Sequence, residues 1–175
     1  MINYVSRKIV LIGVVGLFAV IIYYVIAPNI TLFKNNSLEK RLLIETTSAD
    51  KRPLSIDIGT TTIMVDLAVS VDERTRGLSG QTFLGENRGM LFIFDTPSYP
   101  AIWMKNMLFS IDIAWLDSNF NIIDMKKNVS PSTYPQSFQP TTLAKYVLEV
   151  DSGFFDSHNI SIGSIATLSD SNPSL

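Results

Sequence analysis

The sequence predicts a mainly β domain, a small β-barrel or sandwich of short, largely antiparallel strands with one or two short helices. Short runs rich in branched and aromatic residues recur through residues 56–169, with turn-forming residues between them. A parallel sheet would need long crossover helices, for which the spacing leaves little room. An apolar segment near the N-terminus adds a predicted transmembrane helix before this domain.

The stretch 89–117 is expected to form the centre of the core, because it holds both tryptophans and few charged residues. Its predicted strands are Met90–Phe94, Ile102–Met104 and Ile111–Leu116. Two prolines between Thr96 and Pro100 separate the first two, since proline cannot donate to a central ladder. Lys105, Asn106 and Asp112 are expected to be polar exceptions inside this core.

The segments on either side of this stretch also contain short patterns that predict secondary structure. Alternation of apolar and other residues over Thr62–Val69 predicts a half-buried strand. A capping box from Ser70 to Glu73 predicts a short helix, which Gly77 should end. Further expected elements are strands at Asn121–Lys126, Ala144–Val150 and Gly163–Leu168, and a helical turn at Phe154–His158. The proline-rich stretch Asn128–Thr142 is predicted to be a long surface loop, a kind that is often functional.

The segment Ile9–Ala27 is long and apolar enough to span a membrane. It has nineteen residues without charge or proline, and at about 1.5 Å per residue it matches a hydrocarbon core of roughly 30 Å. Arg7 and Lys8 precede it, which favours a cytoplasmic N-terminus and an extracytoplasmic domain. A cleaved signal peptide is the alternative, but Pro28 directly after the cut disfavours processing. The expected organisation is a cytoplasmic terminus (1–8), a single-pass signal anchor (9–27), a tether (28–55), a globular domain (56–169) and a tail (170–175).

Composition argues against several classes of function. The net charge is −2 and the pI about 5.3, so no basic footprint for nucleic acid is expected. The chain has no cysteine, and its only histidine is His158 in a polar turn. A histidine-based triad or a metal site built from histidine and cysteine therefore has no material. No phosphate-binding glycine loop is present either, and no cofactor or metal is expected.

Four polar residues lie inside or against apolar strands: Lys105, Asn106, Asp112 and Glu149. In one interpretation they face a groove, where Lys105 supplies a cation and the carboxylates its partners. In the other, which is favoured, they are solvated or form a structural ion pair. Trp103 has the same two interpretations, packing in the core or rim first and a stacking platform for a ligand second.

Several short motifs resemble the domain of unknown function 192 family in order and spacing. They are Arg74-x-x-Gly77-Leu78, Gly89-Met90-Leu91-Phe92-x-Phe94, Trp103-Met104-Lys105-Asn106, Ile111-Asp112-Ile113, Val147-Leu148-Glu149 and Gly153 with Ile160-x-x-Gly163. The resemblance covers about residues 56–169. It implies a compact, mainly β domain, often behind an N-terminal export or anchor segment in prokaryotes, and it supplies no activity. The chain departs from the family pattern at Gln81, Ile102 and Ser164, where a basic residue, an aromatic residue and an aspartate are usual.

These observations favour a membrane-anchored extracytoplasmic module that binds a ligand or assists a partner without catalysis. The expected ligand-binding residues are Lys105, Asn106, Asp112, Glu149, Trp103 and Arg74. The expected partners are the membrane, through the N-terminal helix, and a small molecule, a glycan or an envelope protein. The alternative is a hydrolase or lyase of the cell envelope that uses Lys105 and a carboxylate as acid and base. A purely structural partner of another envelope protein is a third hypothesis.

Overall fold

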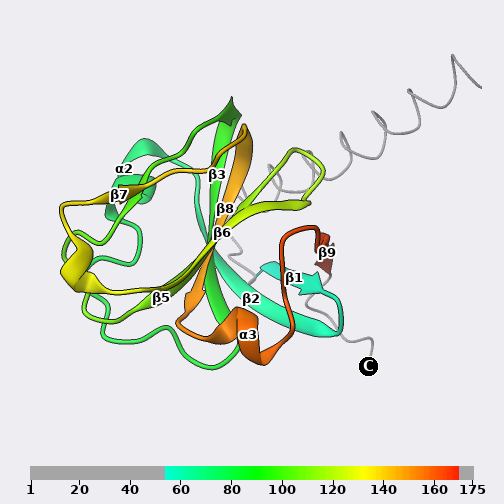
Figure 1. The fold of residues 1–175 in the computed structure, drawn as a ribbon, viewed down its shortest axis with the longest axis horizontal. Coiled ribbons are helices and arrows are strands. Elements are labelled where there is room, and N and C mark those ends of the chain that lie inside the picture. The colour runs from blue at the N-terminus through cyan, green and yellow to red at the C-terminus, as the bar shows by residue number, and fades with distance from the viewer. Residues whose placement is uncertain (1–53, 170–175) are drawn as a thin grey trace, which may run out of the picture. The chain divides into compact units, whose positions relative to one another are not determined.

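The computed structural model describes residues 54–169 (Figure 1). The predicted span Ile9–Ala27, like the cytoplasmic terminus and the tail, lies outside these residues. Among residues 54–169, no helix is both long and apolar enough to cross a membrane. The anchor therefore stays a prediction.

Most of the described strands belong to one sheet, in the order β6-β5-β8-β3-β2-β1-β9. Their bounds are β1 Leu54–Ile58, β2 Thr61–Ala68, β3 Arg88–Ser98, β5 Ile111–Leu116, β6 Ile122–Val129, β8 Ala144–Asp151 and β9 Ala166–Ser169. Two more strands, β4 (Ile102–Trp103) and β7 (Ser137–Phe138), form a separate antiparallel ribbon. Within residues 54–169 the only parallel pair is β2 with β3, so the sheet is largely antiparallel.

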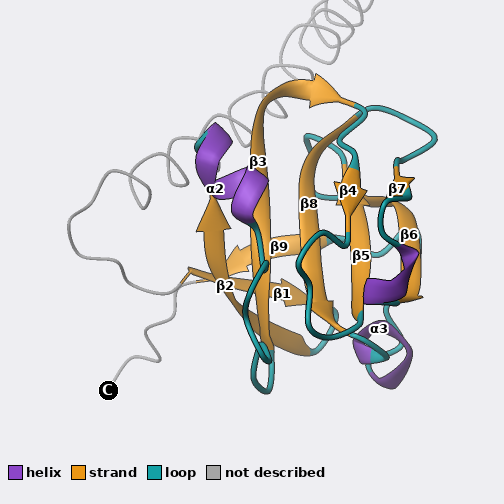
Figure 2. Ribbon diagram, turned by 90° about the vertical axis from the view of Figure 1, so that its left-hand side faces the viewer, coloured by secondary structure: helices purple, strands orange, loops and turns teal. Residues whose placement is uncertain are grey.

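The sheet curls into a half-barrel, as Figures 1 and 2 show. Its two edge strands approach one another at the β5–β6 turn. The amide of Ala166 donates to the carbonyl of Phe120 at 2.9 Å, and the amide of Ile122 donates to the carbonyl of Ser164 at 2.9 Å. The predicted class, mainly β with a few short helices, is confirmed at this level.

The helix α2 (Val71–Arg76) makes the crossover between the parallel strands β2 and β3. Its predicted capping box is present, because the side chain of Ser70 accepts from the amide of Glu73, and the side chain of Glu73 accepts from the amide of Ser70. Gly77 ends the helix with a φ of +49°, a conformation that glycine adopts at little cost. The chain then turns back over the sheet.

Several predicted bounds need correction. β1 was not expected, and β3 continues through Pro97 to Ser98, with an irregular register after Ile93. The stretch Asn128–Thr142 is not a simple loop, since it contains a 3-10 turn (Pro131–Thr133) and β7. The short helix α3 (Phe154–Ser157) matches the predicted helical turn.

The expectation that Lys105 and Asn106 lie inside the core is wrong. Both side chains are exposed, because the strand β4 ends at Trp103 and Asn106 takes a turn conformation with a φ of +57°. Asp112, by contrast, is fully buried.

The sheet buries apolar side chains on both faces, as alternation along its central strand requires. On β8, Val147 and Glu149 point to one face, whereas Tyr146, Leu148 and Val150 point to the other. The first face is covered by the segments that follow α2 and β4. Its buried cluster comprises Ala68, Leu78, Leu84, Met90, Phe92, Ile102, Met104, Met107, Ile111, Ile113, Trp115, Val129, Ala144 and Val147.

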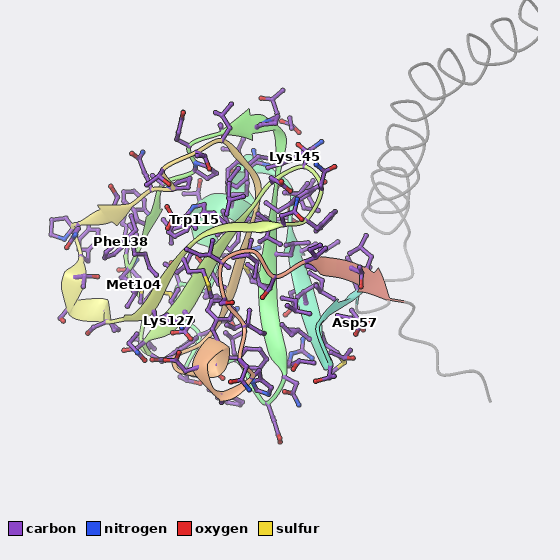
Figure 3. All side chains as sticks on the ribbon, turned by 45° about the vertical axis from the view of Figure 1, so that its right-hand side comes forward. Asp57, Met104, Trp115, Lys127, Phe138 and Lys145 are labelled. Atoms are coloured by element: carbon purple, nitrogen blue, oxygen red, sulfur yellow. The ribbon has the colours of Figure 1, made fainter. Side chains whose placement is uncertain are left out.

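Trp115 fixes one covering segment on this face. Its indole Nε1 donates to the carbonyl of Pro100 at 3.0 Å, so the chain that leads into β4 is tied to the middle of the sheet. Figure 3 shows Trp115, Met104 and Phe138 in the half of the domain away from Asp57 on β1. The candidate site lies under these covering segments.

Candidate functional site

Glu149 is a buried carboxyl group in the middle of the sheet. Its neighbours across the ladder are Met90 on β3 and Ile113 on β5, so apolar side chains flank it on both sides. The residue is only 4% exposed. Within residues 54–169 its side chain has no hydrogen bond and no ion pair. A buried polar group without a partner is costly, and native proteins contain few of them.

Burial changes the acid strength of this group. Desolvation raises the pKa of Glu149 from an ordinary value of 4.5 to about 8, because the charged form loses its hydration. At neutral pH the carboxyl group is therefore mostly protonated, and it can donate as well as accept a hydrogen bond. A side chain that titrates this close to neutral pH is typical of functional sites.

A small open pocket of about 40 Å³ leads to Glu149. Two covering segments form its walls, and Phe92 and Glu149 on the sheet form its base. The residues that line it are Arg74, Thr75, Arg76, Gly77, Leu78, Ser79, Phe92, Ala101, Ile102, Trp103, Met107 and Glu149. Since a cavity needs roughly 10–15 Å³ to hold one water molecule, the pocket accepts a group of only a few heavy atoms.

The two walls are tied together by contacts between their loops. The hydroxyl of Ser79 donates to the carbonyl of Lys105 at 2.8 Å, and the amide of Gly80 donates to the carbonyl of Asn106 at 2.9 Å. Lys105 and Asn106 thus contribute to the rim through their backbones. These contacts hold the segment after α2 beside the segment after β4.

Trp103 gives the pocket an aromatic edge. Its side chain is 44% exposed and lines the pocket, whereas its neighbour Ile102 is buried. The ammonium of Lys105 lies 5.4 Å from the centroid of the Trp103 ring, and Tyr134 meets the same ring edge-on at 6.2 Å. Tyr134 belongs to the Asn128–Thr142 stretch, which therefore contacts the rim.

Arg74 positions the last turn of α2. Its Nη1 donates to the carbonyls of Val69 and Ile93, the latter at 2.8 Å, and its guanidinium lies 5.1 Å from the centroid of the Phe94 ring. These contacts hold the guanidinium against the end of β2 and against β3. The residue lines the pocket, yet much of its hydrogen-bonding capacity serves the fold.

Asp112 lies on the other face of the sheet from Glu149. It is opposite Val150 in the ladder, while Glu149 is opposite Ile113, and successive residues of a strand point to opposite faces. Its Oδ1 accepts from the amide of Asn128 at 2.8 Å and its Oδ2 from the amide of Phe155 at 3.1 Å. Asp112 therefore ties the end of β6 and the helix α3 to the sheet.

The same arrangement of motifs is found in a known family. The model of the DUF192 family, described as "Uncharacterized ACR", matches residues 54–167. The chain belongs to this family. No curated protein matches the DUF192 chain at a significant level.

Solved structures share the fold of this DUF192 domain. One, described as a candidate transcription regulator from Sinorhizobium meliloti, has a TM-score of 0.64 and 23% identity, over 67% of this chain and 94% of that one. Another, a protein of unknown function from Novosphingobium aromaticivorans, has a TM-score of 0.61 and 24% identity, over 66% of this chain and 83% of that one. At these identities the likeness shows the fold alone.

The structure brings together part of the expected site. Arg74, Trp103 and Glu149 line one pocket, Lys105 and Asn106 lie at its rim, and Asp112 lies apart from it. Sequence reasoning did not single out Arg76, Ser79 or Met107, which also line the pocket. The motif from Arg74 to Leu78 marked part of this site in the sequence. Its position over β8 follows only from the strand order of the sheet, which the sequence alone does not give. Of the positions that depart from the family pattern, Ile102 lines the pocket.

Proposed function

We propose that this DUF192 domain binds the small polar end of a ligand in the pocket around Glu149 and does not change it chemically. The observation that carries the proposal is the buried carboxyl group of Glu149, which has no partner within residues 54–169 and lies at an open pocket. A ligand that supplies the missing hydrogen bonds or charge would offset the cost of this burial.

The size of the pocket restricts how the ligand binds. A volume of about 40 Å³ holds the end of a molecule and not a whole drug-sized ligand, which usually occupies roughly 300–1,000 Å³. The remainder of the ligand would lie over Trp103 and Tyr134 on the surface. A small molecule, a glycan or a segment of an envelope protein can each present such an end.

The proposal includes the location of the domain. With residues 9–27 as a single-pass anchor and Arg7 and Lys8 on the cytoplasmic side, the domain would meet its ligand outside the cytoplasmic membrane. Protease added to intact spheroplasts is expected to remove the domain and leave the N-terminal segment. Full protection of the domain would contradict this placement.

A second function is favoured by the buried carboxyl group of Glu149 at the pocket, whose pKa desolvation raises to about 8. A buried carboxyl group that titrates near neutral pH suits general acid–base catalysis by an envelope hydrolase or lyase. Lys105 does not line the pocket, so Glu149 would act without the lysine partner expected from the sequence.

The test is a thermal-shift screen of envelope glycans, peptides and small metabolites on the full chain in detergent micelles. A ligand at about 100 times its Kd is expected to stabilise the wild type by about 2.7 kcal/mol. Glu149→Gln should lose this stabilisation. Glu86→Gln, the same chemical change at an exposed turn residue, should keep it.

Each other result has a defined meaning. Equal stabilisation of the wild type and Glu149→Gln would place the ligand elsewhere and end the proposal. Turnover of a screened ligand that Glu149→Gln abolishes would establish the acid–base enzyme instead.

A further inference from the structure

We propose that the pocket takes a small cationic group, such as a primary ammonium, which pairs with the carboxylate of Glu149 beside the ring of Trp103. This inference rests on the proposed function, because it names the ligand class for the same pocket. Three features of the site carry it, one from each side of the pocket.

The first feature is the charge that Glu149 can supply. Its carboxyl group is the only acidic side chain among the residues that line the pocket. A carboxylate removed from water needs a cation or several hydrogen-bond donors, and residues 54–169 provide neither. A bound ammonium would supply both the opposite charge and the donors.

The second feature is the wall formed by the last turn of α2. A helix end leaves carbonyl oxygens without intrahelical donors. Here the carbonyls of Arg74 and Thr75 accept no hydrogen bond from residues 54–169, and both residues line the pocket. Residues of this wall therefore carry carbonyl acceptors that a donating ligand group could use.

The third feature is the aromatic edge. The face of a tryptophan ring attracts cations through its quadrupole. The structure contains such a contact, since the ammonium of Lys105 lies 5.4 Å from the centroid of the Trp103 ring. Because Trp103 lines the pocket, we expect a ligand cation bound there to lie beside this residue.

Three cationic side chains oppose this ligand. Arg74 and Arg76 reach the pocket from α2, and Lys105 lies at the rim after β4. The Nη1 of Arg74 donates to the carbonyls of Val69 and Ile93, and within residues 54–169 no ion pair joins Arg74 to Glu149. Arg76 and Lys105 are exposed, where salt screens their charge. They reduce the affinity for a free cation and do not remove the pairing site.

The proton held by Glu149 determines how binding depends on pH. Because burial raises the pKa of Glu149 to about 8, a cation must displace a proton from the carboxyl group at neutral pH. The affinity for a cation then rises with pH, by up to about tenfold per unit below pH 8, and levels off above it. An anionic ligand, which needs the protonated acid, would show the opposite trend.

The experiment uses the 15N-labelled full chain in detergent micelles, titrated with ethylammonium, acetate and acetamide at pH 6, 7, 8 and 9. Ethylammonium is expected to shift the amide signals of the pocket residues, with a Kd that falls by about tenfold from pH 6 to pH 7. Acetate and acetamide should leave these signals in place. Lys105→Met is expected to tighten ethylammonium binding at low salt, because it removes a like charge from the rim.

Variants of the protein distinguish a specific pairing of ethylammonium with Glu149 from nonspecific effects of mutation on the fold. Glu149→Gln should weaken ethylammonium binding by about tenfold or more and abolish its dependence on pH, while Glu86→Gln should behave as the wild type. Trp103→Leu, a change at a partly exposed position, should weaken binding by about threefold or more. If Glu149→Gln does not fold, the pH dependence of the wild type and the effect of Trp103→Leu still decide the matter.

The cation inference and the binding function can fail separately. Acetate binding that strengthens as pH falls would contradict the inference that the ligand is a cation. The pocket would then be a binding site for anions. If ethylammonium shifts no amide signal of the pocket residues at any pH, the inference of a cationic ligand is also contradicted. The proposed function is tested independently by the broad thermal-shift screen, and it fails if that screen yields no ligand that depends on Glu149 or if Glu149 turns the ligand over.

Discussion

Asp112 and Glu149 lie on the neighbouring strands β5 and β8 and are both almost fully buried, yet their surroundings are opposite. Asp112, on one face of the sheet, accepts hydrogen bonds from two backbone amides. Glu149, on the other face, has an open pocket and no partner within residues 54–169. Burial of an acid therefore does not by itself indicate function, because its hydrogen-bond partners determine whether it stabilises the fold or is available to a ligand.

The largest expected effect is the loss of Asp112. Asp112→Ala should lower the free energy of unfolding by about 2–4 kcal/mol, because one buried and one partly buried backbone amide lose their acceptor, and a fully buried unsatisfied group costs roughly 1–3 kcal/mol. Urea unfolding followed by tryptophan fluorescence measures the loss. Asp156→Asn is the control, since it breaks only an exposed ion pair with Lys127 and should cost about 0.5 kcal/mol or less. An equal loss of stability in the two variants would mean that Asp112 does not hold the end of β6 and the helix α3 to the sheet.

The opposite sign is expected on the other face. Glu149→Leu should raise the free energy of unfolding by about 1–3 kcal/mol, because it replaces an unpaired buried carboxyl group by an apolar side chain of similar size. The same urea experiment measures the gain. A loss of stability as large as that of Asp112→Ala would show that Glu149 also has a structural role. The two acids would then not differ in the way proposed.

The smallest change, taken per pH unit, is the dependence of stability on pH. In the unfolded chain Glu149 releases its proton near 4.5, whereas in the folded domain it keeps the proton up to about pH 8. Between these values the folded state binds more protons than the unfolded state, so stability falls as pH rises, by up to about 1.4 kcal/mol per unit. Urea midpoints measured from pH 5 to pH 9 test this. Glu149→Gln should lack this contribution, and identical slopes for the two proteins would disprove the raised pKa.

Local signals made part of the fold predictable. The bounds of β5, Ile111–Leu116, were expected from its apolar run, and the capping box of α2 was expected from four consecutive residues. Both depend on interactions within a few residues of the chain. β1 was missed because Leu54–Ile58 becomes a strand by pairing with β2 and β9, which a short run next to a linker does not reveal.

The candidate site was less predictable because it depends on pairing between distant segments. Glu149 was correctly expected inside an apolar strand, but the face to which it points follows from its register with Ile113. A single step of register separates it from Asp112, so sequence alone grouped two acids that the sheet separates. The position of the exposed Lys105 and Asn106 depends on backbone contacts of their loop with Ser79 and Gly80, which lie far away in sequence.

The closure of the sheet edges has a consequence for biosynthesis. β1 is the first described strand and pairs with β9, the last one, and the residues just before β9 also bond to the β5–β6 turn. While the ribosome has not yet released Ala166–Ser169, the nascent domain presents β1 as an open edge that can pair with other chains. A chain that stops before Ala166 lacks β9, so we expect it to expose β1 as an edge that favours pairing with other chains.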